Sequence, residues 1–172
     1  MKIAILGFSG CGKSTLARTL GEKYQLPVLH LDSLHFETDW AEKPRERELA
    51  EIRAFLDSHE GWVIDGNYSK LEQPRRLADA DAIILLELNR FVCLWRVLKR
   101  WLTYRGQSRP DMAAGCKEKV DWEFLRWVLH DGRSKGKKAA YDRVAQEYSH
   151  KVTRIRTVKQ QREFLRKLEE QR

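Results

Sequence analysis

The sequence lacks the features that mark several classes of protein. It has only 3 cysteines in 172 residues, widely spaced at positions 11, 93 and 116, so neither a disulfide framework nor a cysteine-rich metal site is expected. The longest apolar runs, such as Ala82–Leu86, are too short to cross a bilayer. The first residues show no signal-peptide segment with a cleavage site. With 4 prolines and 42% hydrophobic residues, extensive disorder is not expected, and we expect a folded chain in a reducing, cytoplasmic compartment.

Positive charge is scarce in the first half of the chain and abundant in the second. Residues 1–89 hold 11 Lys and Arg against 15 Asp and Glu, whereas residues 90–172 hold 22 against 10. The formal net charge of +8 therefore arises entirely in the second half. Such asymmetry favours an anionic partner and leaves open whether that partner is nucleic acid, a nucleotide or only counterions.

Short apolar segments alternate with segments of helical periodicity along the chain. Strands are expected at 2–6, 28–31, 62–64, 82–86 and 152–156, and helices at 13–24, 45–58, 91–104, 121–131, 139–149 and around Phe164–Leu168. A capping box at Ser69–Glu72 predicts a further short helix beginning there. Residues 33–43 are expected to be irregular, and residues 105–120 to form a lid-like flap. The alternation predicts one α/β domain over residues 1–172, with a parallel sheet and helices on both faces.

The first predicted strand leads into a phosphate-binding loop. Gly7-Phe8-Ser9-Gly10-Cys11-Gly12-Lys13-Ser14 matches G-x-x-x-x-G-K-[ST] in full, between a strand and a helix. The glycines let backbone N–H groups point at phosphate oxygens, the lysine adds positive charge, and the serine hydroxyl suits Mg²⁺. The residues expected to bind the nucleotide are Gly7, Ser9, Gly10, Cys11, Gly12, Lys13, Ser14 and Thr15.

Two carboxylates follow neighbouring predicted strands. Asp65 ends the third strand, where an acid is expected to hold Mg²⁺ together with Ser14. Asp32 ends the second strand, where it could orient or deprotonate an acceptor hydroxyl. The alternatives are a turn-forming role for Asp65 and a helix cap or loop hydrogen bond for Asp32. His30 and His35 flank Asp32, and packing or surface positions are favoured for them over metal binding.

The phosphate loop, the Asp65-Gly66 turn and the arginine-rich segment after the fourth strand resemble the adenylate-kinase-like P-loop kinases. The chain is more closely similar to the bacterial DNA topology modulation proteins, described as adenylate-kinase-related, in the segments Leu31–Leu34, Val63–Tyr68, Ser108–Met112 and Gly115–Glu118. The resemblance implies a three-layer P-loop NTPase fold, five parallel strands in the order 2-3-1-4-5, and ATP and Mg²⁺ as cofactors.

The resemblance also implies lid arginines that contact phosphate. Arg100, Arg105 and Arg109 resemble the lid arginines of adenylate kinases by position, and an arginine fork suits the charge of a transferring phosphoryl group. The alternative is a solvated basic helix face.

Both arginines that hold an acceptor phosphate in adenylate kinases are missing. The turn after strand three contains Asn67-Tyr68-Ser69 without an arginine, and His35 stands where an arginine follows the second strand. Arg75 and Arg76 are candidate substitutes, or they cap a surface helix. The position of Asp32 resembles instead that of small-molecule kinases, whose acceptor is a hydroxyl.

These observations predict an ATP-dependent phosphotransferase that acts on a nucleoside, nucleotide or other small hydroxyl compound, with Lys13, Asp32 and the flap arginines as catalytic residues. One alternative is a nucleic-acid-binding DNA topology modulator, favoured by the basic cluster Arg133, Lys135, Lys137 and Lys138. Another is a nucleotide-binding switch without catalysis. No membrane partner is expected. The helical spacing of Trp95 and Trp122 favours packing over base stacking.

Overall fold

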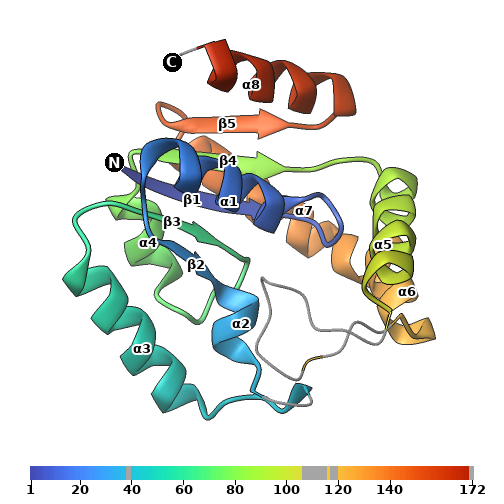
Figure 1. The fold of residues 1–172 in the computed structure, drawn as a ribbon, viewed down its shortest axis with the longest axis horizontal. Coiled ribbons are helices and arrows are strands. Elements are labelled where there is room, and N and C mark those ends of the chain that lie inside the picture. Colours follow the sequence, from blue (N-terminus) through green and yellow to red (C-terminus); the bar gives the residue numbers. More distant parts are fainter. Residues whose placement is uncertain (38–39, 106–115, 117–119, 171–172) are drawn as a thin grey trace.

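Five parallel strands form one sheet in the order β2-β3-β1-β4-β5 (Figure 1). The computed structural model describes residues 1–37, 40–105, 116 and 120–170. The strands are β1 (Lys2–Gly7), β2 (Val28–His30), β3 (Trp62–Asp65), β4 (Ala82–Leu86) and β5 (Val152–Ile155). The predicted order 2-3-1-4-5 is confirmed, and with it the P-loop NTPase fold.

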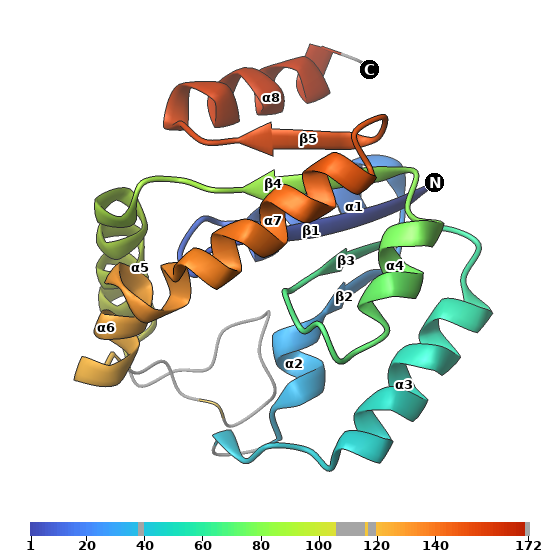
Figure 2. The ribbon, with the colours of Figure 1, turned by 180° about the vertical axis from the view of Figure 1, so that it is seen from behind.

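Helices lie on both faces of the sheet. They are α1 (Lys13–Tyr24), α2 (Leu31–His35), α3 (Arg45–Ser58), α4 (Gln73–Asp79), α5 (Arg90–Tyr104), α6 (Trp122–Leu129), α7 (Lys135–Glu147) and α8 (Val158–Glu170), with a 3₁₀ turn at Asp131–Arg133. Helix α1 covers one face, and α4 and α7 cross the other (Figures 1 and 2). Both faces of the central strands are therefore covered, which is why β1, β3 and β4 are almost wholly buried.

The strand register brings the functional segments to one edge. Asp65 is paired with Ile5 of β1 and with His30 of β2. Gly7, at the end of β1, is paired with Leu86 of β4. Because all strands are parallel, their carboxyl ends meet at this edge, and the phosphate loop between β1 and α1 lies beside Asp65.

Three local predictions are corrected. Residues 31–35 form helix α2, although a strand was expected to end at residue 31 and residues 33–43 were expected to be irregular. A helical turn places Leu31 and Leu34 on the same side, where both are buried. The segment 69–72 is not the start of a helix: Glu72 adopts a left-handed conformation with φ 49°, and α4 begins at Gln73. Helix α7 begins at Lys135 rather than residue 139, because the Ser134 side chain caps it by accepting from Lys137 N.

The helical spacing predicts an apolar stripe of Phe91, Leu94, Trp95, Leu98 and Leu102 on α5. The packing face of the helix differs from this stripe. The buried residues are Cys93 and Val97, whereas Phe91, Trp95 and Leu102 are exposed to 68%, 64% and 65%. The buried face of α5 carries the small side chains of Cys93 and Val97 because the phosphate loop lies very close to the helix backbone. The approach is so close that a Cβ on Gly10 would lie only 2.7 Å from the Cys93 carbonyl oxygen. Helix α5 therefore packs against the loop by close backbone approach, and its large apolar side chains point elsewhere.

Trp122 of α6 is exposed as well, at 77%, so the prediction that Trp95 and Trp122 pack in the interior is wrong. Among the described helices, none is both long and apolar enough to cross a membrane.

Candidate active site

A cavity of about 1610 Å³ opens beside the carboxyl edge of the sheet. The phosphate loop lines it, and so do side chains from elements far away in the sequence: Asp32 of α2, Tyr68 after β3, Arg96 and Arg100 of α5, Trp127 of α6 and Lys137 of α7. The strand order thus gathers most of the predicted nucleotide-binding residues, Asp32 and the flap arginine Arg100 around one space.

The phosphate loop wraps the start of α1. Gly10 and Gly12 have φ of +78° and +91°, a region that glycine adopts without the strain of a side chain. Lys13 Nζ donates to the Phe8 carbonyl across the loop at 3.2 Å. Of the eight predicted nucleotide-binding residues, six line the cavity, namely Ser9, Gly10, Gly12, Lys13, Ser14 and Thr15. Gly7 and Cys11 are buried behind them.

Ser14 lines the cavity and contacts Asp65, which is buried behind it and does not itself line the cavity. Ser14 Oγ donates to Asp65 Oδ2 at 3.0 Å, and Asp65 Oδ1 contacts His30 Nδ1. Asp65 is only 4% exposed, so this pairing with a histidine fixes its carboxylate. A hydroxyl and a carboxylate are the hard oxygen donors that suit Mg²⁺, which usually keeps few protein ligands and adds phosphate and water oxygens. The two residues therefore fit the predicted Mg²⁺.

His30 and His35 both contact carboxylates. His35 Nδ1 contacts Glu48, which is buried, and His35 Nε2 lies 3.7 Å from Glu42. Within the described residues, no cluster of three or more His, Cys, Asp and Glu side chains could hold a metal ion. The role of His30 as the partner of Asp65 was missed by the sequence analysis, although the two residues end neighbouring strands.

Asp32 lies in the first turn of α2 and faces the cavity. Its Oδ1 accepts a hydrogen bond from Tyr68 OH at 2.8 Å. Burial, followed by the negative charge of Asp32, raises the pKa of Tyr68 far above its usual range. The phenol therefore stays protonated and keeps donating, which orients the Asp32 carboxylate.

Asn67 is a residue of the site that the sequence analysis treated only as part of a turn. Its Oδ1 accepts from Gly7 N at 3.0 Å and from Tyr141 OH at 3.1 Å, and its Nδ2 donates to Gly7 O at 2.8 Å. One amide thus ties the start of the phosphate loop to the loop after β3 and to α7.

The back of the phosphate loop is anchored to α5 and α8. Arg96 donates to the Cys11 carbonyl at 2.8 Å and to Gln161 Oε1 at 2.8 Å. The Cys11 and Cys93 sulfurs lie 3.3 Å apart. The hydrogen bond from Cys93, helped by the charges of Lys13 and Arg133, lowers the pKa of Cys11 to about 6 against the opposing effect of burial.

The three predicted flap arginines lie differently with respect to the cavity. Arg100 lines it. Arg105 is exposed, and its guanidinium carbon lies 5.2 Å from the centroid of the Trp101 ring. Arg109 and most of the flap lie outside the described residues, as do most of the segments at 108–112 and 115–118. The role of all three arginines in phosphate binding stays a prediction.

Two residues of the basic cluster at 133–138 belong to this region. Arg133 is 9% exposed, donates to the Leu88 and Val128 carbonyls and lies over the Phe8 ring of the phosphate loop at 4.2 Å. Lys137 Nζ lies 3.5 Å from the Trp127 ring centroid, and Trp127 Nε1 donates to Ser9 Oγ at 3.1 Å. Partial burial lowers the pKa of Lys137.

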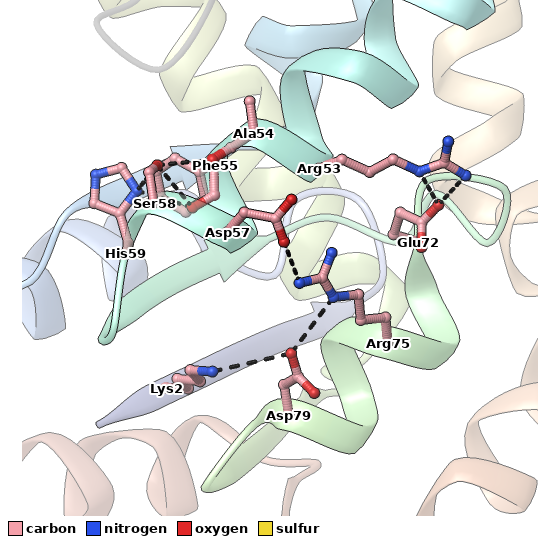
Figure 3. A network of polar contacts seen from close by, with 10 residues as sticks. All are labelled: Lys2, Arg53, Ala54, Phe55, Asp57, Ser58, His59, Glu72, Arg75 and Asp79. Carbon is pink, nitrogen blue, oxygen red and sulfur yellow. Dashed lines mark hydrogen bonds and ion pairs between the residues drawn. The ribbon is translucent and has the colours of Figure 1, made fainter.

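Arg75 and Arg76 do not replace the missing acceptor arginines. Arg75 lies between Asp57 of α3, at 2.5 Å, and Asp79 of α4, at 3.7 Å (Figure 3). Arg76 is 0% exposed and donates to the Leu71 and Tyr68 carbonyls. Burial lowers its pKa to about 10. Arg75 therefore joins two helices at the surface, and Arg76 holds the loop that carries Tyr68.

Two known proteins are similar to this chain in sequence. The chain is 31% identical over 144 residues to a shikimate kinase of Rhodococcus jostii (strain RHA1), covering 73% of this chain and 78% of that protein. It is 25% identical over 148 residues to an adenylate kinase of Listeria monocytogenes serotype 4a (strain HCC23), covering 67% and 69%.

Two further comparisons concern families and folds. No family model matches the chain. The crystal structure of an uncharacterized protein from Eubacterium ventriosum ATCC 27560 shares the fold, with a TM-score of 0.51 and 18% identity over 100% of both chains. The phosphate loop, the sheet order and the two named relatives show that the chain is a nucleotide-binding protein of the P-loop kinase family to which shikimate kinase and adenylate kinase belong.

Proposed function

We propose that the protein is an ATP-dependent phosphotransferase that transfers the γ-phosphoryl group of ATP to a hydroxyl of a small acceptor. The observation that carries the proposal is the arrangement around one cavity: Ser14 contacts Asp65 at the phosphate loop, and Asp32 faces the same space with its carboxylate oriented by Tyr68. A nucleotide-phosphate site beside an oriented carboxylate is what transfer to a hydroxyl needs.

Each residue has a stated role in this proposal. The loop N–H groups and Lys13 bind the phosphates, and Ser14 and Asp65 would hold Mg²⁺, which neutralises phosphate charge when bound. Asp32 accepts the proton of the acceptor hydroxyl as its oxygen bonds to phosphorus and the bond to ADP breaks. Arg100 from the cavity wall stabilises the charge of the transferring group, and we extend the same role to Arg105 and Arg109 of the flap.

The similarity to DNA topology modulation proteins keeps nucleic-acid binding as an alternative. The basic cluster supports nucleic-acid binding less strongly in the structure than in the sequence, because Arg133 is buried and Lys137 lies beside the phosphate loop. Only Lys135 and Lys138 of that cluster are exposed. If DNA binding falls steeply with salt and is lost on reversing these two charges, this alternative is favoured.

The test is ADP release from ATP in the presence of a panel of nucleosides, nucleotides, sugars and hydroxy acids. We expect one group of acceptors to stimulate release by the wild type, and Lys13→Ala to abolish the stimulation. Binding of ATP with no acceptor-dependent release across the panel would favour a nucleotide-binding switch instead. Equal release by the wild type and Lys13→Ala would refute the proposal.

A further inference from the structure

The end of the cavity around α2 carries acidic and aromatic side chains. We define this acceptor end as Asp32, Phe36, Trp40, Glu42 and Tyr68, all of which line the cavity. The Phe36 ring lies 5.3 Å from that of Trp40. Two carboxylates and three aromatic rings therefore face the space next to the proposed catalytic acid.

Within the described residues, no arginine or lysine forms an ion pair with Asp32 or Glu42 of the acceptor end. Asp32 accepts from Tyr68, and the Glu42 carboxylate lies 3.7 Å from His35 Nε2. His35 is shared with the buried Glu48, so its positive charge, where present, is already balanced.

The basic residues nearby serve other parts of the fold. Arg75 pairs with Asp57 of α3 and Asp79 of α4, and Arg76 is wholly buried, with its Nε and Nη2 donating to backbone carbonyls. Lys137, which does line the cavity, lies against Trp127 at the phosphate loop. Of the cations that line the cavity, Lys13, Arg96 and Lys137 lie at the phosphate loop. Arg18, Arg100 and Arg143 also line the cavity, and among the described residues none of them forms an ion pair with Asp32 or Glu42.

We infer that the acceptor is a ring-containing hydroxyl compound without an anionic group, the chemistry shared by nucleosides and amino sugars. Its hydroxyl or ammonium groups donate to Asp32 and Glu42, and its ring lies against the aromatic side chains. A phosphate or carboxylate on the acceptor would face these carboxylates, and like charges at such distances repel. This inference rests on the proposed phosphotransferase function.

The test compares matched pairs of ring-containing compounds: adenosine with its monophosphate, and glucosamine with glucuronate. Each is assayed for stimulation of ADP release and, by calorimetry, for binding to the protein holding a non-hydrolysable ATP analogue. We expect kcat/KM and affinity to favour the uncharged or cationic member of at least one pair by about tenfold. Preference for the anionic member, or binding of no compound in the panel, would overturn the inference.

Glu42→Lys provides a second, independent measurement. The Glu42 side chain is 74% exposed, so the fold should tolerate the change. We expect the preference to shift toward the anionic member by about tenfold. Glu60→Lys is the control, because Glu60 is exposed just before β3, at the opposite edge of the sheet. If Glu42→Lys shifts the preference no more than Glu60→Lys does, the acceptor end is assigned wrongly.

The two proposals fail in different ways. If the uncharged compounds bind selectively but never stimulate ADP release, the phosphotransferase proposal fails and the ligand class stands. If ADP release depends on Lys13 but is stimulated best by phosphorylated or carboxylated compounds, the ligand class fails and the phosphotransferase stands.

Discussion

Replacing Asp65 with asparagine should separate its effect on stability from its effect on Mg²⁺. Asp65 Oδ2 accepts from Ser14 Oγ at 3.0 Å, and Oδ1 contacts His30. Asp65→Asn keeps the shape of the side chain but is neutral and retains only one acceptor oxygen, so one of the two contacts loses its acceptor and the other loses its charged partner. A lost hydrogen bond to a charged group costs about 1.5–3 kcal/mol, which a domain with a stability of about 5–15 kcal/mol survives.

The same substitution should weaken Mg²⁺-dependent nucleotide binding. Losing a residue that orients metal ligands typically costs about 10–100-fold in metal affinity, so we expect the half-saturating Mg²⁺ concentration for ATP binding to rise by about that factor. Calorimetry at fixed ATP measures it, and urea denaturation measures stability. Asp79→Asn is the control, because Asp79 forms ion pairs with Lys2 and Arg75, away from the phosphate loop (Figure 3). A folded Asp65→Asn protein with unchanged Mg²⁺ dependence would refute the assignment.

Two further predictions concern stability. Gly10→Ala should lower the free energy of unfolding by about 2–5 kcal/mol, because its Cβ would lie 2.7 Å from the Cys93 carbonyl oxygen and its φ is +78°. Gly12→Ala should lower it by only about 1–2 kcal/mol, because the nearest atom to its Cβ is Arg96 Nη1 at 3.4 Å. Equal losses of stability on urea denaturation would contradict the packing of α5 on the loop. Burial and Asp32 raise the pKa of Tyr68 in the folded state, so its contribution to stability is present below about pH 10, the pKa of an unfolded tyrosine, and is lost above it. Tyr68→Phe should therefore reduce the fall in stability above pH 10 by about 1.4 kcal/mol per pH unit, and an unchanged slope in pH-dependent denaturation would show that the phenol is not buried against the carboxylate.

The sheet and the position of Asp65 were predictable because they depend on local pattern. Apolar runs identified four of the strands. The phosphate-loop motif identified the strand that leads into the nucleotide site, because the motif directly follows that strand. The known strand order of the resembling kinases then placed the end of β3 beside Ser14, and the structure agrees.

The partners of the site residues were not predictable because they come from distant parts of the chain. Asn67 lies 60 residues from Gly7 and 74 from Tyr141, and nothing in the turn sequence indicates either contact. The exposed stripe of α5 was predicted to be buried because helical periodicity identifies an apolar face but not what covers it. Arg133 was counted in a basic cluster that favours nucleic-acid binding, because sequence alone does not show the carbonyls that accept from a buried arginine.

In the proposed reaction, Asp32 serves phosphoryl transfer and not nucleotide binding. The most direct measurement follows labelled γ-phosphoryl from ATP into a covalent product with the best acceptor of the panel. We expect Asp32→Asn to bind ATP with wild-type affinity and to transfer label about 10²–10⁴-fold more slowly, the usual contribution of a general base. Wild-type rates of label transfer by a folded Asp32→Asn protein would contradict the account.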